Sequence, residues 1–130
     1  MNMVLCDTDV MIEYLKGNEQ TKETLNDIGA ENIALSSITI MELYFGVLNK
    51  RELGKIKETV EKLEILHINE SISKKAVELI EEYSKSYRLK IPDALIGATS
   101  LCHRIELFTY NIKDFRFIEG LKLYRKLLKD

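Results

Sequence analysis

The sequence predicts an α/β protein: a three-layer α/β/α sandwich in which helices cover both faces of a central, mostly parallel sheet. Two observations predict this class. Short apolar runs alternate along the chain with segments of helical spacing, and several of the apolar runs are continuous. Strands of a parallel sheet are buried on both faces, so they read as unbroken apolar runs joined by helices. The 130 residues are predicted to form one domain, residues 1–130, with a core that needs no disulfide or structural metal.

The first half of the chain alternates two apolar runs with four segments of helical spacing. In order, these are a strand at 3–6, helices at 10–16 and 21–28, a strand at 33–35, and helices at 38–48 and 52–63. Gly17 and Gly29 end the first two helices. Ser36 and Ser37 predict a cap for the third helix, and the fourth is charged and amphipathic.

The second half continues the alternation. In order, it contains a strand at 64–68, helices at 71–87 and 92–103, a strand at 106–109 and an edge strand at 120–124. Pro92 is predicted at the first helical position, where its missing N–H costs nothing. The run from Ala94 to Cys102 has no charge, which predicts a helix buried on both sides.

Composition excludes several classes of protein. A net charge of −2 argues against a protein that coats nucleic acid, although an enzyme can grip nucleic acid through metal ions and a few local cations. The longest uncharged run is too short to span a bilayer, and no basic leader precedes the first strand. We therefore expect a cytoplasmic protein with no membrane segment, in which Cys6 and Cys102 are buried thiols.

Acidic and amide side chains follow the predicted strands. Asp7 ends the first strand, Glu42 lies on the helix after the second, and Asp93 opens the helix before the 106–109 strand. Asn111 and Asp114 follow that strand. Because sites in open parallel sheets form outside the carboxyl ends of the strands, these five residues are the candidate site.

Each candidate also has a structural interpretation. Glu42 is the single charge between residues 33 and 48, and a buried carboxylate is costly unless it is paired or bound to metal; the alternative is a bond to Ser36 or Ser37. Asp7 is a good helix cap, and Asp93 suits the first turn of a helix. Asp9 is left open between a cap, a supporting role and a metal ligand.

A cluster of carboxylates favours divalent metal. The side chains repel one another unless a cation neutralises them, and oxygen ligands suit Mg²⁺ or Mn²⁺ better than zinc. The two histidines, His67 and His103, lie on a strand and at a helix end and are poor catalytic candidates. A metal so held can activate water for phosphodiester hydrolysis without a side-chain nucleophile.

Four segments resemble, in order, the motifs of PIN-domain ribonucleases of the VapC toxin type. They are VLCDTDVMIEYLKG, SSITIMELYFG, IPDALIGATSL and FTYNIKDF, which together span residues 4–115. The resemblance implies a PIN-like fold, Mg²⁺- or Mn²⁺-dependent endoribonuclease activity, and a toxin of a type II toxin–antitoxin system. It assigns metal ligation to Asp7, Glu42 and Asp93. The family's fourth acidic place falls near Asn111, where Asp is common, and Asp114 is the alternative.

The resemblance also implies partners. These are an RNA substrate, a second copy in a homodimer, and a cognate antitoxin whose peptide blocks the acidic pocket. Candidate antitoxin contacts on the early helices are Tyr14, Tyr44 and Phe45. Candidate cations for the RNA backbone are Lys16, Arg51, Lys113 and Arg116.

Two other functions compete. VLCDTDV and IALSS resemble motifs of haloacid-dehalogenase-type phosphatases, in which Asp7 would be the nucleophile and Asp9 the general acid. That mechanism needs a later acidic pair where this chain has Asp93 alone, and it gives Glu42 no role. The second alternative is a PIN-fold binding module without activity, suggested by Asn111 in the acidic place.

Overall fold

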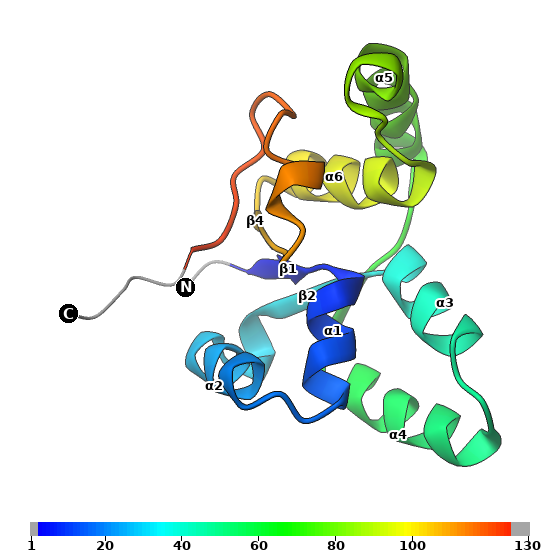
Figure 1. Cartoon of the computed structure of the whole chain (residues 1–130), viewed down its shortest axis with the longest axis vertical. Coiled ribbons are helices and arrows are strands. Elements are labelled where there is room, and N and C mark those ends of the chain that lie inside the picture. Colours follow the sequence, from blue (N-terminus) through cyan, green and yellow to red (C-terminus); the bar gives the residue numbers. More distant parts are fainter. Residues whose placement is uncertain (1–2, 126–130) are drawn as a thin grey trace.

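The computed structural model describes residues 3–125, and it confirms the predicted fold class (Figure 1). Its four strands form one parallel sheet in the order β3-β2-β1-β4. The strands are β1 (Val4–Cys6), β2 (Ile33–Ser36), β3 (Glu64–Leu66) and β4 (Glu106–Phe108). The first and last strands of the chain are therefore neighbours in the middle of the molecule.

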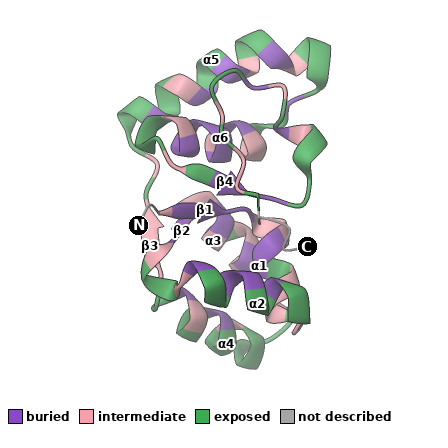
Figure 2. Cartoon of the chain, turned by 90° about the vertical axis from the view of Figure 1, so that its left-hand side faces the viewer, coloured by how far each residue is buried: buried purple, intermediate pink, exposed green. Residues whose placement is uncertain are grey.

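Helices cover both faces of this sheet (Figure 2). The helices are α1 (Thr8–Leu15), α2 (Glu19–Ile28), α3 (Ser37–Phe45), α4 (Lys50–Val60), α5 (Glu70–Tyr87) and α6 (Ile91–His103). Two 3₁₀ turns, η1 (Ala30–Asn32) and η2 (Ile112–Asp114), precede β2 and follow β4. The pair α5 and α6 lies on one face of the sheet, and the other four α-helices lie on the opposite face.

Alternate strand residues supply two separate cores, because successive side chains of a strand point to opposite faces. Leu5 and Leu107 pack with the α5–α6 side, while Val4, Cys6 and Phe108 pack with the other four helices. All five of these strand residues are buried. Every strand is thus covered on both sides, as the continuous apolar runs predicted.

Several predicted boundaries were wrong by a few residues. The third helix ends at Phe45 rather than 48, and Pro92 is the second rather than the first residue of α6. Cys102 is exposed, which corrects its predicted burial. It lies in the last turn of α6, where the helix reaches the surface. An uncharged sequence does not guarantee burial, since apolar atoms make up more than half of a typical protein surface.

The predicted edge strand at 120–124 is reduced to a single bridge. Leu107 pairs with Leu123 in parallel, through bonds from Leu107 N to the Lys122 carbonyl (2.9 Å) and from Tyr124 N to the Leu107 carbonyl (2.8 Å). This short strap covers the outer edge of β4. Across residues 3–125, no helix is long and apolar enough to cross a membrane.

Candidate active site

Asp7 lies at the carboxyl end of β1 and caps α1. Its Oδ1 accepts a hydrogen bond from Thr8 N (2.8 Å), and its Oδ2 accepts one from the Thr109 hydroxyl (2.7 Å). Only 4% of Asp7 is exposed. Burial, and then the negative charge of Asp9, raise the pKa of Asp7 to about 7, although both hydrogen bonds oppose the shift.

Asp9 follows one residue later, in the first turn of α1. Its Oδ2 accepts a hydrogen bond from Tyr110 N (3.0 Å), whereas its Oδ1 is buried and has no hydrogen-bond partner. Burial raises the pKa of Asp9. An unpartnered carboxylate oxygen is costly inside a protein, and a cation is the group that would satisfy it.

Glu42 reaches the site from α3. The hydroxyl of Thr8 donates to Glu42 Oε1 (2.7 Å) and lies 3.0 Å from the hydroxyl of the buried Thr39. The serine partner considered from sequence is wrong, because Ser36 caps α3 by accepting from Ile38 N (3.2 Å). Glu42 is therefore tied to the residue between Asp7 and Asp9.

Asp93 lies in the first turn of α6, in the helical layer on the other face of the sheet from α1 and α3. Burial, followed by the negative charges of Asp7, Asp114 and Glu42, raises the pKa of Asp93 to about 6, and Lys90 opposes the shift. Charge–charge interactions weaken with distance, so a shift with these causes agrees with four carboxylates from separate elements lying around a common space.

Asn111 and Asp114 occupy different places around this space. Asn111 N donates to the Thr109 hydroxyl (3.0 Å), which fixes the loop after β4, and the Asn111 side chain is exposed. Asp114 is half-buried at the end of η2 and contributes to the field at Asp93. Of the two candidates, Asp114 is the one that adds negative charge near Asp93, and which residue takes the fourth acidic place stays a prediction.

The donor set fits a hard divalent cation. The converging side chains offer carboxylate oxygens, one of them unpartnered, and the pKa values of three of the carboxyl groups, Asp7, Asp9 and Asp93, are raised. Within residues 3–125, no three His, Cys, Asp or Glu side chains are close enough to enclose one ion. A cation in this space would be held directly by only one or two carboxylates and otherwise through water, as Mg²⁺ usually is.

The two histidines lie outside the site. His103 is ten residues beyond Asp93 on the same helix, about 15 Å further along its axis. His67 is exposed just after β3. Neither is placed to move a proton among the carboxylates.

Three threonine hydroxyls were missed as site residues in the sequence. The Thr8 hydroxyl bonds to Glu42 and to the Thr39 hydroxyl, and the Thr109 hydroxyl bonds to Asp7. Thr8 stands between two aspartates, and Thr109 directly follows an apolar strand, so their positions were visible. Their partners lie 34 and 102 residues away, and only the fold could identify them.

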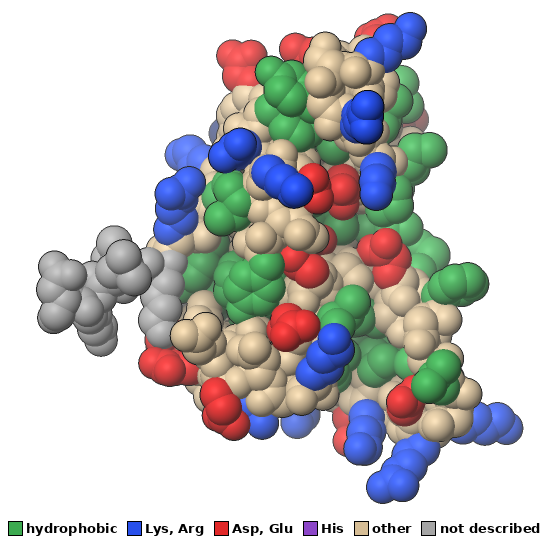
Figure 3. Space-filling view, in the orientation of Figure 1, with side chains coloured by type: hydrophobic (Ala, Val, Ile, Leu, Met, Phe, Trp, Pro, Cys, Tyr) green, Lys and Arg blue, Asp and Glu red, His purple; other side chains and the backbone are tan. Residues whose placement is uncertain are grey.

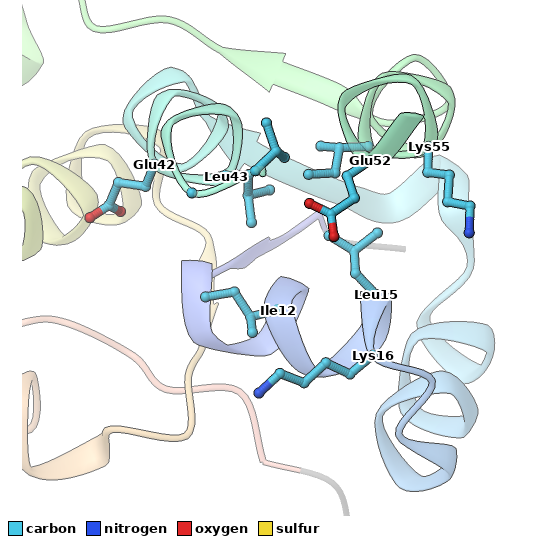
Figure 4. A pocket seen from close by; sticks show the side chains of 10 residues that line it. Ile12, Leu15, Lys16, Glu42, Leu43, Glu52 and Lys55 are labelled. Carbon is cyan, nitrogen blue, oxygen red and sulfur yellow. The ribbon is translucent and has the colours of Figure 1, made fainter. Parts of the chain in front are cut away.

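An apolar groove opens beside the carboxylates, between α1, α3 and α4 (Figure 4). It has a volume of about 430 Å³, and its apolar lining includes Ile12, Leu15, Leu43 and Ile56. Glu42 stands at its end and points away from it, towards α6.

The candidate contact residues differ in exposure. Phe45 is 93% exposed, beside the exposed Met41 and Leu48, whereas Tyr14 and Tyr44 are half-buried against the core. All four candidate cations, Lys16, Arg51, Lys113 and Arg116, are exposed.

Charge is sorted on the face that carries the site (Figure 3). Asp and Glu side chains gather in the middle of this face, between α6 and α1, and Lys and Arg side chains lie above and beside them. Lys113 lies in η2 and Arg116 just after it, and both side chains are exposed. An acidic centre with a basic margin is compatible with a metal-assisted reaction on a polyanion.

Comparison with known proteins gives consistent matches. The ribonuclease VapC10 of Mycobacterium tuberculosis is 27% identical over 92% of this chain and 91% of its own length. The ribonuclease VapC3 of Methanocaldococcus jannaschii is 33% identical over 71% of this chain and 92% of its own. A chain of a toxin–antitoxin complex from Klebsiella pneumoniae superposes with a TM-score of 0.78 at 34% identity, covering 91% of this chain and 94% of that one.

A family model agrees with these relatives. The PIN domain model matches residues 4–120, which include every candidate site residue. It gives no support to the haloacid-dehalogenase alternative, and Ser36, in the segment that suggested it, is occupied as a helix cap. The fold, the relatives and the family model lead to one conclusion: this chain belongs to the PIN domain family.

Proposed function

We propose that this protein is a metal-dependent endoribonuclease and the toxin of a type II toxin–antitoxin pair. The observation that carries the proposal is the convergence of carboxylates from separate elements: Thr8 bonds to both Asp7 and Glu42, and the buried Asp9 Oδ1 has no hydrogen-bond partner. The raised pKa of Asp93, caused by burial and by the carboxylates of Asp7, Asp114 and Glu42, agrees with this geometry. Such a cluster is unfavourable unless it serves a cation. Relatives named as ribonucleases and a similar chain in a toxin–antitoxin complex support the same function.

In the proposed mechanism, Asp7, Glu42 and Asp93 would hold Mg²⁺ or Mn²⁺, at most two of them directly and the rest through bound water, with Asp9 and Asp114 adding negative charge. The bound metal would supply a nucleophile by lowering the pKa of water, and would stabilise charge on the phosphodiester. The chain's own part is positioning. Thr109 orients Asp7, Thr8 orients Glu42, and the loop bonds of Asn111 and Tyr110 keep the acidic space open on one side.

The apolar groove is the proposed seat of the antitoxin peptide. It begins beside Glu42, so a chain lying in it would end at the carboxylates and block them. Val47 lines the groove, and its backbone N donates to the Tyr44 carbonyl rather than to a carboxylate of the candidate active site. We expect Val47→Glu to weaken co-purification with the cognate antitoxin while RNA cleavage by the free protein persists.

The exposed side chains of Met41, Phe45 and Leu48 give a surface for a second copy of the chain, in line with the proposed homodimer. Burial of large apolar side chains is what a stable homodimer needs. Sedimentation equilibrium of the wild type and of Phe45→Ser checks this, with a shift to monomer expected for the variant.

The decisive experiment incubates the purified protein with a mixed, structured RNA and Mg²⁺ or Mn²⁺. Parallel reactions contain a chelator, or Asp93→Asn, or the matched control Glu58→Gln, which alters an exposed acid on α4. Cleavage should persist in the control and disappear with chelator and with Asp93→Asn. Cation binding without cleavage of any RNA would instead identify an inactive binding module.

A further inference from the structure

A second pocket adjoins the carboxylates and shares the side chain of Ile12 with the apolar groove. We call it the Tyr110 pocket; it has a volume of about 490 Å³ and is lined chiefly by Asp9, Glu13, Asn18, Gln20, Tyr110 and Asn111. It shares Asp9 and Asn111 with the candidate active site. Any group held there would lie directly beside a bond cleaved at the carboxylates.

The ring of Tyr110 is held in place from three directions. Its backbone N donates to Asp9 Oδ2 (3.0 Å), and its ring meets Phe108 edge-on, with the ring centres 5.4 Å apart. Its hydroxyl lies 2.6 Å from that of Thr21, which is 1% exposed. Tyr110 itself is 46% exposed. A fixed, partly exposed aromatic ring is a ready platform for stacking, because little freedom is lost on binding.

The hydroxyl bond of Tyr110 has a defined direction. Thr21 donates its single proton to Asn18 Oδ1 (3.1 Å), so the Tyr110 hydroxyl must be the donor to Thr21. Asn18 Oδ1 also accepts from Thr21 N (3.0 Å) and so caps α2. This chain of bonds joins the loop after β4 to the start of α2. The two walls of the pocket are therefore held together before any ligand arrives.

The charge of the lining identifies the occupant. Asp9 and Glu13 line the pocket, three amide side chains accompany them, and no Lys or Arg faces it apart from Lys16 beside Glu13. That ion pair is 3.7 Å long and exposed, so it leaves Glu13 free to accept hydrogen bonds. A phosphate would be repelled here. A neutral aromatic base can stack on Tyr110 and offer N–H groups to the acceptors.

We propose that the Tyr110 pocket binds one nucleobase of the RNA next to the cleaved phosphodiester, and that it favours bases with an exocyclic amino group over uracil. Carboxylate and amide oxygens accept from the amino groups of adenine, cytosine and guanine, and uracil has none. This inference rests on the proposed ribonuclease function. It adds that the Tyr110 pocket helps to determine the position at which the RNA is cut.

The first test sequences the ends of products cut from an RNA of random sequence. For the wild type, uracil should be depleted at one position beside the cut. Tyr110→Leu should lower kcat/KM by about 10-fold, mainly through KM, and Glu13→Gln should flatten the depletion. Tyr110→Phe keeps the ring and should stay within about 3-fold of wild type. The matched control is Tyr87→Leu, at a 56% exposed tyrosine on α5, which should change neither quantity.

A second test is independent of catalysis. Adenosine, cytidine, guanosine and uridine are titrated separately into the metal-free protein, and the amide signals of Tyr110 and Asn111 are followed by NMR. The inference is supported if the amide signals shift with the three amino-bearing nucleosides, shift less with uridine, and do not shift in Tyr110→Leu. This support holds even if no RNA is cleaved, because a lack of cleavage would refute only the proposed function. Equal or stronger shifts with uridine overturn the base preference. No shift with any nucleoside, together with an unchanged cut pattern in Tyr110→Leu, overturns the inference.

Discussion

At the scale of single residues, burial dominates over hydrogen bonding at Asp7. Two donors, Thr8 N and the Thr109 hydroxyl, favour the ionised carboxylate, yet its pKa is raised to about 7. Desolvation and the adjacent Asp9 outweigh both bonds. The donors therefore orient the carboxylate without offsetting the cost of burying its charge.

Asp9 is the residue whose role the sequence left open, and its unpartnered Oδ1 predicts a part in cation binding. We expect Asp9→Asn to lower the affinity for Mg²⁺ by about 10-fold, because the amide keeps an oxygen for Tyr110 N but removes the charge. A Mg²⁺ titration of RNA cleavage measures this affinity. Unchanged affinity would leave Asp9 only the task of holding the loop at Tyr110.

Residue-level prediction from sequence worked where a charge stood out from its surroundings. Glu42 is alone among apolar neighbours, and Asp93 precedes an uncharged helix, so both could be identified without a fold. Thr8 and Thr109 could not, since threonine is common at helix starts and strand ends. Their contribution depends on partners that are distant in sequence.

At the scale of elements, the site depends on the hydrogen bonds that join the carboxyl ends of the paired strands β1 and β4. Asp7 N donates to the Phe108 carbonyl (2.9 Å), and one residue further on Thr109 meets the Asp7 side chain. The Thr109 hydroxyl accepts from Asn111 N, so its proton is directed to Asp7. One side chain thus links the first strand, the last strand and the loop that carries Asn111.

These hydrogen bonds give a prediction with an internal control. Thr109→Val should reduce cleavage at limiting Mg²⁺ by about 10-fold, because Asp7 loses the bond that orients it, whereas Thr109→Ser should restore near-wild-type activity. Activity is measured across a Mg²⁺ series for both variants. Equal losses in the valine and serine variants would mean that packing of the threonine methyl matters, and not its hydroxyl.

Helix starts are a second element-level feature with a measurable energy. Asn49 caps α4 by accepting from Glu52 N (2.9 Å), and Glu52 in turn accepts from Leu48 N (2.7 Å). Asn49→Ala should lower the free energy of unfolding by about 1 kcal/mol, as loss of an N-cap typically does. Urea denaturation measures the change. Asn26→Ala, at an exposed position inside α2, is the control and should be at least as stable as wild type.

The sequence predicted the number and order of the main elements better than their ends. The glycines after α1 and α2 and the serines before α3 were readable signals. The end of α3 at Phe45 was missed because apolar residues continue to Leu48, although Gly46, which caps the helix, is a local stop signal. The segment at 120–124 was reduced to a bridge by Gly120, whose φ of 84° turns the chain just before Leu121.

At the scale of the whole molecule, the carboxylates make stability depend on pH. An unfolded Asp ionises near pH 3.8, whereas Asp93 and Asp7 hold their protons to about 6 and 7 in the folded protein. Between these values the folded form binds more protons than the unfolded form. The contribution of these two groups to the free energy of unfolding therefore falls as the pH rises from about 4 to 7.

We compare the metal-free wild type with an Asp7→Asn/Asp93→Asn double variant. When the pH rises from 5 to 8, the melting temperature of the wild type should fall by several degrees more than that of the variant. Added Mg²⁺ should restore the wild type at pH 8 and have little effect at pH 5, where the carboxyl groups keep their protons. Thermal denaturation at both pH values, with chelator or Mg²⁺, checks this. Parallel pH curves for the two proteins would contradict the raised pKa values.

The adjacency of β1 and β4 also has a consequence during synthesis. Thr109 and Asp114 leave the ribosome more than 100 residues after Asp7, at about 5–20 residues per second. Until they arrive, Asp7 lacks its orienting bond and the acidic cluster lacks one member. A partly made chain would therefore lack the complete acidic site that the proposed function needs, and that site would form only several seconds after Asp7 is made.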